Sequence, residues 1–183
     1  ESMAQQLLKI KNIKTLKRRI EKRGKTKTKS GASQVSLITE NNETQFYGKN
    51  VLGYIEGMDP KLKNELIVIT AHYDHIGIIN GKIHNGADDN ASGTSAVLEI
   101  AKTFQLAQEQ GISFKRSILC MPVSAEEKGL LGSYYYAANP EYPLTNTIAN
   151  LNIDMIGRMD EFHPNNDNYI YLIGSDKLSS ELH

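Results

Sequence analysis

Leu66-Ile67-Val68-Ile69-Thr70-Ala71-His72-Tyr73-Asp74-His75 is the stretch of sequence that decides the fold. It opens with a continuous run of apolar and β-branched side chains, which is typical of a strand buried on both faces of a largely parallel sheet. Histidines and an acidic residue follow directly where this run ends. The pattern predicts a buried central strand over 65–71 with a polar cluster at its carboxyl end.

Segments with strand-like and helical patterns alternate on both sides of this stretch. Further strands are expected at 35–39, 50–56, 116–123, 148–155 and 169–173, a loop at 86–93, and helices at 95–110 and 129–138. Alternating strands and helices are typical of the α/β class. We therefore predict a three-layer sandwich in which a mixed, largely parallel central sheet is flanked by helices.

The first 31 residues differ in charge from the rest of the chain. Residues 1–30 carry 11 of the 21 Lys and Arg residues and two acidic residues, whereas residues 31–183 carry 10 basic and 19 acidic residues. Apolar residues recur at helical spacing from Met3 to Ile20, and Gly24 begins a linker pattern that runs to Gly31. We interpret residues 1–31 as a basic helix and linker, and residues 32–183 as a separate domain.

Several partners and sites are disfavoured by the same composition. A basic segment could bind nucleic acid, but no aromatic residue interleaves these lysines, so we favour a solvated helix and expect no nucleic-acid partner. No apolar run approaches the ~20 residues of a membrane span. Cys120 is the single cysteine, and we expect it to be a buried core residue. The sequence leaves the oligomeric state open.

Four polar clusters lie near the expected strand ends. They are His72–His75, Asn85–Gly93, Ser124–Glu127 and Asn152–Asp154. Each alone has a structural explanation, such as a helix cap or a solvated helix start. Ligands bind at the carboxyl ends of parallel strands, where these clusters meet. Imidazole and carboxylate groups together form a ligand set for zinc or a related divalent ion, and two neighbouring ions need a shared carboxylate.

Taken together, the clusters resemble the secreted bacterial di-zinc aminopeptidases. The similarity covers roughly residues 50–175 and rests on His72–His75, Gly86–Gly93, Glu126–Ser133 and Asn152–Met155. The wider superfamily includes glutamate carboxypeptidase and the transferrin receptor. The resemblance implies a zinc-dependent metallo-exopeptidase that releases N-terminal residues from peptides, and a secreted or periplasmic protein.

The resemblance also implies how two zinc ions are bound. His72 and Asp154 correspond to ligands of one zinc, Asp89 to the carboxylate that bridges both ions, and Glu127 to a ligand of the second zinc. The peptide bond between Asp89 and Asn90 is expected to be cis, as in that family.

Two further acidic residues are implied to be catalytic. Glu126 corresponds to the general base, and Asp74 to the acid that orients His72. The positions agree with this, because Asp74 lies on the same side of an extended chain as His72 and can accept its free ring N–H. Glu126 and Glu127 point in different directions if the chain is extended, so one can bind metal while the other acts as a base.

In the family, a further His ligand of the second zinc lies well after the Asp154 segment. The basic helix and linker resemble a stretch that follows an inserted protease-associated domain in larger members. We therefore expect residues 32–183 to be a zinc exopeptidase domain shortened at its C-terminus, and residues 1–31 to be a remnant that follows an upstream or inserted domain. His183 is not assigned to the metal.

Three alternatives remain to be weighed. A metallo-β-lactamase-like hydrolase would need a histidine two residues before His72, where Thr70 stands. Another branch of the superfamily, a carboxypeptidase or a glutaminyl cyclase, is compatible with the same motifs. A non-catalytic binding relative would be expected to lose ligands or Glu126, and the motifs in this chain are intact.

Overall fold

The computed structural model describes residues 2–7, 9–26, 36–164 and 168–179. The chain divides into a unit of residues 1–45 and a unit of residues 46–183. The central sheet and all of its helices belong to the second unit.

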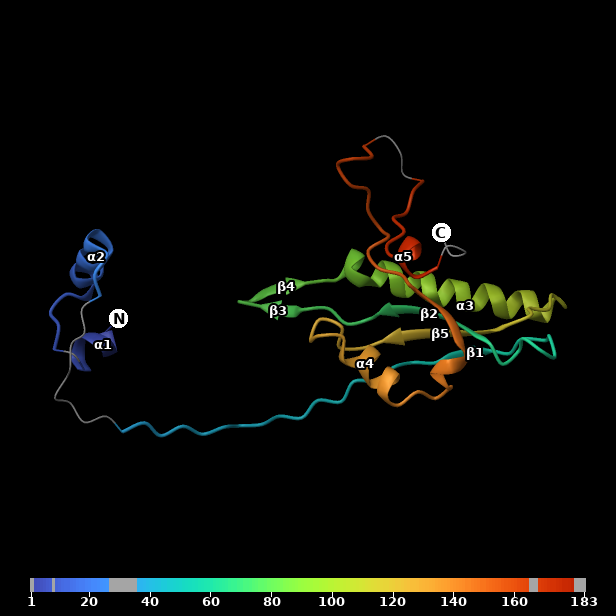
Figure 1. Cartoon of the computed structure of the whole chain (residues 1–183), viewed down its shortest axis with the longest axis horizontal. Helices are drawn as coiled ribbons and strands as arrows, with labels where there is room; N and C mark the ends of the chain where they lie inside the picture. Colours follow the sequence, from blue (N-terminus) through green and yellow to red (C-terminus); the bar gives the residue numbers. More distant parts are fainter. Residues whose placement is uncertain (1, 8, 27–35, 165–167, 180–183) are drawn as a thin grey trace. The chain divides into compact units, whose positions relative to one another are not determined.

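Four strands form one mixed sheet (Figure 1). β2 (Leu66–His72) lies between β5 (Ser117–Val123) and β6 (Thr147–Asn152) and pairs with both in parallel. β1 (Gly53–Ile55) pairs with β5 in the antiparallel direction, so the strand order is β1-β5-β2-β6. The predicted mixed, largely parallel sheet is confirmed.

Helices cover both faces of this sheet. Figure 1 shows α3 (Gly93–Glu109) along one face and α4 (Leu131–Ala138) on the other. Successive strand residues point to opposite faces, so β2 and β5 contribute to two separate cores. The core on the α3 side contains Ile69, Ala71, Val97, Ile118 and Cys120, and the core on the α4 side contains Leu66, Val68, Leu119, Met121, Val123 and Tyr136. This arrangement confirms the three-layer α/β sandwich.

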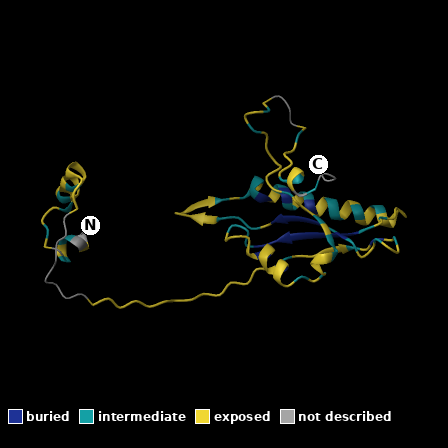
Figure 2. Ribbon diagram, viewed as in Figure 1, coloured by how far each residue is buried: buried dark blue, intermediate teal, exposed yellow. Residues whose placement is uncertain are grey.

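The two central strands hold the best-protected side chains. All seven residues of β5 are buried, and so are six of the seven residues of β2 (Figure 2). Cys120 is among them, as expected, and burial raises the pKa of its thiol. The carboxyl ends of these two strands therefore offer a rigid support, on which side chains can be held in fixed positions.

Three expected strands differ in the structure. The segment expected at 148–155 forms β6, which ends at Asn152 and is mostly exposed, because among the described residues only β2 pairs with it. Residues 169–173 form no strand and are largely exposed. Residues 36–39 form no strand either, and residue 35 lies outside the described residues. An apolar or β-branched run predicts strand propensity but not the neighbouring strand that it needs.

Shorter elements complete the second unit. A hairpin joins β3 (Gly77–Ile79) to β4 (Lys82–His84). The loop expected at 86–93 forms a wide helical turn, η1 (Ala87–Ser92), that leads into α3. A 3₁₀ turn, η2 (Leu144–Asn146), precedes β6, and α5 (Ser175–Leu178) lies near the end of the described chain.

Among its described residues the first unit has two helices, α1 (Ser2–Leu7) and α2 (Ile13–Arg23), so the prediction of one helical segment over 3–20 is wrong. The Asn12 side chain accepts the N–H of Thr15 at 3.0 Å and caps the N-terminus of α2, which separates this helix from α1. Gly24, at φ 60°, ends α2 as expected. The linker to residue 31 lies mainly outside the described residues, so the domain boundary stays a prediction. None of the described helices is long and apolar enough to span a membrane.

Candidate metal centre

The parallel strands bring the four predicted metal ligands to one edge of the sheet. His72 is the last residue of β2, and Glu127 follows the end of β5. Asp154 lies two residues after β6, and Asp89 lies in η1, directly before α3. Residues that are up to 82 positions apart in the sequence therefore meet because the three strands share one direction.

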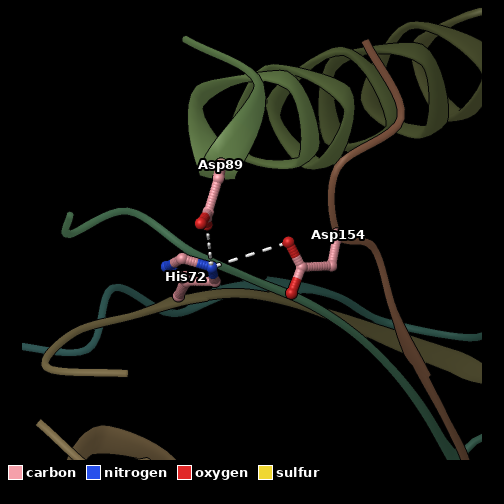
Figure 3. Close-up of side chains that lie close together, drawn as sticks. All are labelled: His72, Asp89 and Asp154. Atoms are coloured by element: carbon pink, nitrogen blue, oxygen red, sulfur yellow. Dashed lines mark ion pairs between the residues drawn. The ribbon is translucent and has the colours of Figure 1, made fainter. Parts of the chain in front are cut away.

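One group consists of His72, Asp89 and Asp154 (Figure 3). The Nε2 atom of His72 lies 3.2 Å from Oδ1 of Asp89 and 3.6 Å from Oδ1 of Asp154. The imidazole is buried, whereas both carboxylates are partly open to solvent. Burial raises the pKa of Asp154, and the nearby carboxylates of Asp89 and Asp88 raise it further, while His72 opposes them.

A second group consists of His75, Asp89 and Glu127. The other carboxylate oxygen of Asp89, Oδ2, lies 3.8 Å from Nδ1 of His75, and that nitrogen lies 2.8 Å from Oε1 of Glu127. Asp89 thus presents one oxygen to each of two imidazoles. This is how a carboxylate must be placed if it is to bridge two metal ions.

The spacing of these atoms fits zinc in both groups. Two ligand atoms that each lie about 2.0–2.1 Å from one tetrahedral ion are about 3.3–3.4 Å apart. The distances of 3.2 and 3.6 Å in the first group, and of 2.8 and 3.8 Å in the second, lie on either side of this value. Imidazole nitrogen and carboxylate oxygen are also the donor types that zinc takes in catalytic sites.

Asp74 lies beside His72, but it makes different contacts from those expected. Nδ1 of His72 hydrogen-bonds with the main-chain carbonyl of Asp74 at 3.1 Å, and the carboxylate is farther away, at 3.8 Å. The carboxylate instead accepts the backbone N–H groups of Glu126 and Glu127, at 3.0 and 3.2 Å. Asp74 therefore fixes the ring of His72 through its backbone and the Glu126–Glu127 turn through its side chain.

Glu126 and Glu127 direct their side chains to different places. Ala125, at φ 56°, turns the chain sharply after β5. Glu127 then contacts His75, whereas Glu126 lines a cavity of about 340 Å³ together with His72 and Asp154. The two neighbouring carboxylates are thus available for two different tasks.

Asn90 is a positioning residue that the sequence analysis did not single out. Its side chain is almost fully buried, donates to the carbonyl of Ile153 at 3.0 Å, and accepts the N–H groups of Gly93 and Met155 at 2.9 and 3.3 Å. It thereby ties the start of α3 to the segment that carries Asp154. The Asp89–Asn90 peptide bond is cis, which confirms the prediction from the resemblance.

A separate polar cluster surrounds Asp160, away from these ligands. Its carboxylate accepts hydrogen bonds from the Tyr171 hydroxyl and from the backbone N–H groups of Phe162 and His163, both at 3.0 Å. These bonds, chiefly the one from Tyr171, lower the pKa of Asp160 to about 2 and raise that of Tyr171 to about 12. The groups in this cluster satisfy one another, which suits a role in holding residues 160–163 against residues 169–171.

Comparison with known proteins agrees with this geometry. The model of peptidase family M28 matches residues 50–174, which include all the ligands described above. The chain belongs to peptidase family M28. The resemblance found in the motifs is thereby confirmed at the level of the family, which is one of zinc metallopeptidases acting on peptides.

Named relatives in this family include both amino- and carboxypeptidases. The chain is 30% identical over 135 residues to aminopeptidase YwaD of Bacillus subtilis, covering 73% of this chain and 27% of the relative. It is 34% identical over 107 residues to a probable glutamate carboxypeptidase of Arthroderma benhamiae, covering 58% and 14%. The solved structure of BSAP, a zinc aminopeptidase from Bacillus subtilis, is 33% identical, with a TM-score of 0.47 over 59% of this chain and 24% of that one. The chain thus spans about a quarter of the length of the aminopeptidases that it matches.

Proposed function

We propose that this M28 chain carries the active site of a two-zinc aminopeptidase, which releases N-terminal residues from peptides. One observation carries the proposal: Asp89 presents its two carboxylate oxygens to two separate imidazole–carboxylate groups. The Bacillus subtilis relative named aminopeptidase supports the choice of activity within the family.

The chain's own side chains divide the work of hydrolysis between them. His72, Asp154, Asp89 and Glu127 would hold the ions, and zinc bound there would supply Lewis acidity toward the scissile carbonyl and the attacking water. Glu126 takes the proton from this water and passes it to the leaving amine. A carboxylate that is bonded to zinc is a poor base, so the different directions of Glu126 and Glu127 serve the reaction.

The test compares peptides that differ only at their N-terminus. The protein is incubated with a peptide bearing a free α-amino group and with its N-acetylated form, and the products are identified by mass spectrometry. We expect single residues to be released from the free peptide only, and a zinc chelator to abolish the release. Equal cleavage of both peptides would contradict the aminopeptidase assignment.

The carboxypeptidase relative supports a second candidate activity. The same ligands and the same base would serve a carboxypeptidase, because the chemistry at the scissile bond does not depend on which terminus is bound. An N-acetylated peptide ending in glutamate, added to the same assay, distinguishes the two activities. Release of its C-terminal residue, with no release from the N-terminus of the free peptide, would favour the carboxypeptidase.

A further inference from the structure

We infer that His75 is a ligand of the second metal ion, which it binds through Nδ1 together with Asp89 and Glu127. This inference rests on the proposed two-zinc centre and deepens it. The resemblance assigns no role to His75 and expects the imidazole ligand of this ion from a segment beyond Asp154. The structure offers an imidazole much nearer to both carboxylates.

The contact between His75 and Glu127 is not that of an ordinary hydrogen-bonded pair. Their closest atoms are 2.8 Å apart, yet the contact does not meet the geometry of a hydrogen bond, and Nδ1 of His75 has no hydrogen-bond partner among the described residues. The nitrogen itself is buried. A buried polar atom without a partner is costly, and an ion placed between the nitrogen and the two carboxylates would satisfy it.

The ring of His75 is held in place from two sides. Its neighbour Asp74 is fixed by the N–H groups of Glu126 and Glu127, so the backbone before the ring is tied to the turn that carries Glu127. On the other side lies Gly86, in the loop that leads to Asp89. A Cβ atom at Gly86 would lie 2.9 Å from Cβ and Cγ of His75, so glycine lets this loop pack directly against the ring.

The resulting ligand set suits a catalytic ion. One imidazole, one carboxylate and a shared carboxylate supply three protein ligands from the described residues, which is the number of protein ligands that a catalytic zinc ion takes. The first group has the same composition, with His72, Asp154 and Asp89. The two groups are related by the way they share Asp89, and they differ in the ring atom that binds: Nε2 in His72 and Nδ1 in His75.

The test counts zinc in the purified chain and in two matched variants. His75→Ala removes the inferred ligand, and His84→Ala removes an imidazole from β4, which lies in neither metal group. Each protein is stripped with a chelator, titrated with zinc by calorimetry and analysed for bound metal by mass spectrometry. Circular dichroism checks that the variants are folded. We expect two ions in the wild type and in His84→Ala, and one in His75→Ala.

The affinity of the second ion separates a ligand from an outer partner. Loss of an outer partner weakens a metal typically by about 10–100-fold, so we expect a loss of more than about 100-fold in His75→Ala. Two ions bound with wild-type affinity in His75→Ala would overturn the inference and leave the two-zinc proposal standing. A single ion in the wild type would contradict both.

An atom-specific measurement covers the case in which His75→Ala does not fold. Long-range ¹H–¹⁵N spectra of the wild type report the two ring nitrogens of each histidine separately. Addition of zinc should shift the Nδ1 resonance of His75 and the Nε2 resonance of His72. A shift at His72 with no change at Nδ1 of His75 would overturn the inference without any variant.

Discussion

Glu126 and Glu127 are chemically identical neighbours whose surroundings differ. Glu127 faces His75, and Glu126 faces the cavity beside His72 and Asp154. Changing Glu126 to Gln keeps the size of the side chain but removes the base, so we expect the rate of peptide hydrolysis to fall by about 10²–10⁴-fold with zinc content nearly unchanged. Changing Glu127 to Gln should weaken one zinc ion, and excess zinc should partly restore activity.

These two variants serve as controls for each other. Both remove one negative charge from the same turn, so a difference between them must come from the direction of the side chain. Zinc content by mass spectrometry and turnover are measured on the same preparations. Loss of zinc in Glu126→Gln with retention in Glu127→Gln would show that the two roles are reversed.

Asp74 is not itself a proposed metal ligand, yet its change should disturb the site because it contacts His72 and Glu127. Each of its carboxylate oxygens accepts one backbone N–H of the Glu126–Glu127 turn. Changing Asp74 to Asn would keep an acceptor for one of these backbone N–H groups but turn an N–H₂ group toward the other. That backbone N–H and the N–H₂ group would then face each other without an acceptor. We expect the free energy of unfolding to fall by about 1–3 kcal/mol, as judged by urea denaturation, and zinc binding to weaken.

Asp59 offers a matched control for this change. Its carboxylate also accepts two backbone N–H groups, from Lys61 and Leu62 at 2.8 and 3.1 Å, but both bind the same oxygen, Oδ1. An asparagine keeps that acceptor, so Asp59→Asn should leave stability and zinc binding close to those of the wild type. An equal effect of the two substitutions would show that Asp74 acts only through its charge.

Most of the site residues could be predicted from sequence because their chemistry marks them. The predicted ligands His72, Asp89, Glu127 and Asp154 do meet in the structure. The partner of the Asp74 carboxylate could not be predicted, because it consists of backbone N–H groups about 50 residues away. Asn90 lies within the quoted motif, but its role depends on the carbonyl of Ile153, which no local pattern reveals.

At the scale of elements, the junction between η1, α3 and the end of β6 positions the first metal group. Gly93 starts α3, and a Cβ atom there would collide with the backbone carbonyl of Ile153 and with the amide of Asn90. Changing Gly93 to Ala must therefore push the segment that carries Asp154 away from the helix. We expect the melting temperature and the zinc affinity to fall together, with a cost of about 1–3 kcal/mol in stability.

A glycine with more room provides the comparison. A Cβ atom at Gly53 in β1 would make only ordinary contacts with Cys120, at 3.7 and 4.0 Å. Gly53→Ala should therefore have little effect on the melting temperature or on zinc affinity measured by calorimetry. If Gly93→Ala binds zinc as tightly as Gly53→Ala, the junction does not control the position of Asp154.

The elements differ in how far the sequence predicts them. β2, β5, α3 and α4 lie where hydrophobic pattern predicts them, since they form the two cores. Residues 169–173 have the same apolar character, but no strand in the part of the chain that the structure describes pairs with them, and they stay exposed. The β3–β4 hairpin was not predicted, although Asn80-Gly81, at φ 51° and 76°, is the turn pair that favours such hairpins.

At the scale of the whole molecule, the metal groups connect parts of the chain that the sheet alone leaves loosely joined. β6 lies at an edge and is largely exposed, and Asp154 follows it. Asp89 comes from a turn before α3, and Glu127 from the loop after β5. Ions held by these residues would link all three segments, so metal binding and folding should be coupled.

This coupling predicts that zinc raises the stability of the protein. An ion that binds only the folded chain stabilises it by about 2.7 kcal/mol per site at a free concentration 100 times its dissociation constant. Without ions, Asp89 and Asp154 lie close together as like charges, and their repulsion opposes folding. We therefore expect chelation to lower the melting temperature by several degrees and added zinc to restore it.

The Asp89→Asn variant tests whether this effect arises at the proposed centre. An amide cannot bridge two ions as a carboxylate does, so zinc should raise the melting temperature of this variant far less than that of the wild type. The metal-free variant should be no less stable than the metal-free wild type, because the substitution removes a like charge beside Asp154. If zinc leaves the melting temperature of the wild type unchanged while mass spectrometry shows zinc bound, the ions lie outside the folded site.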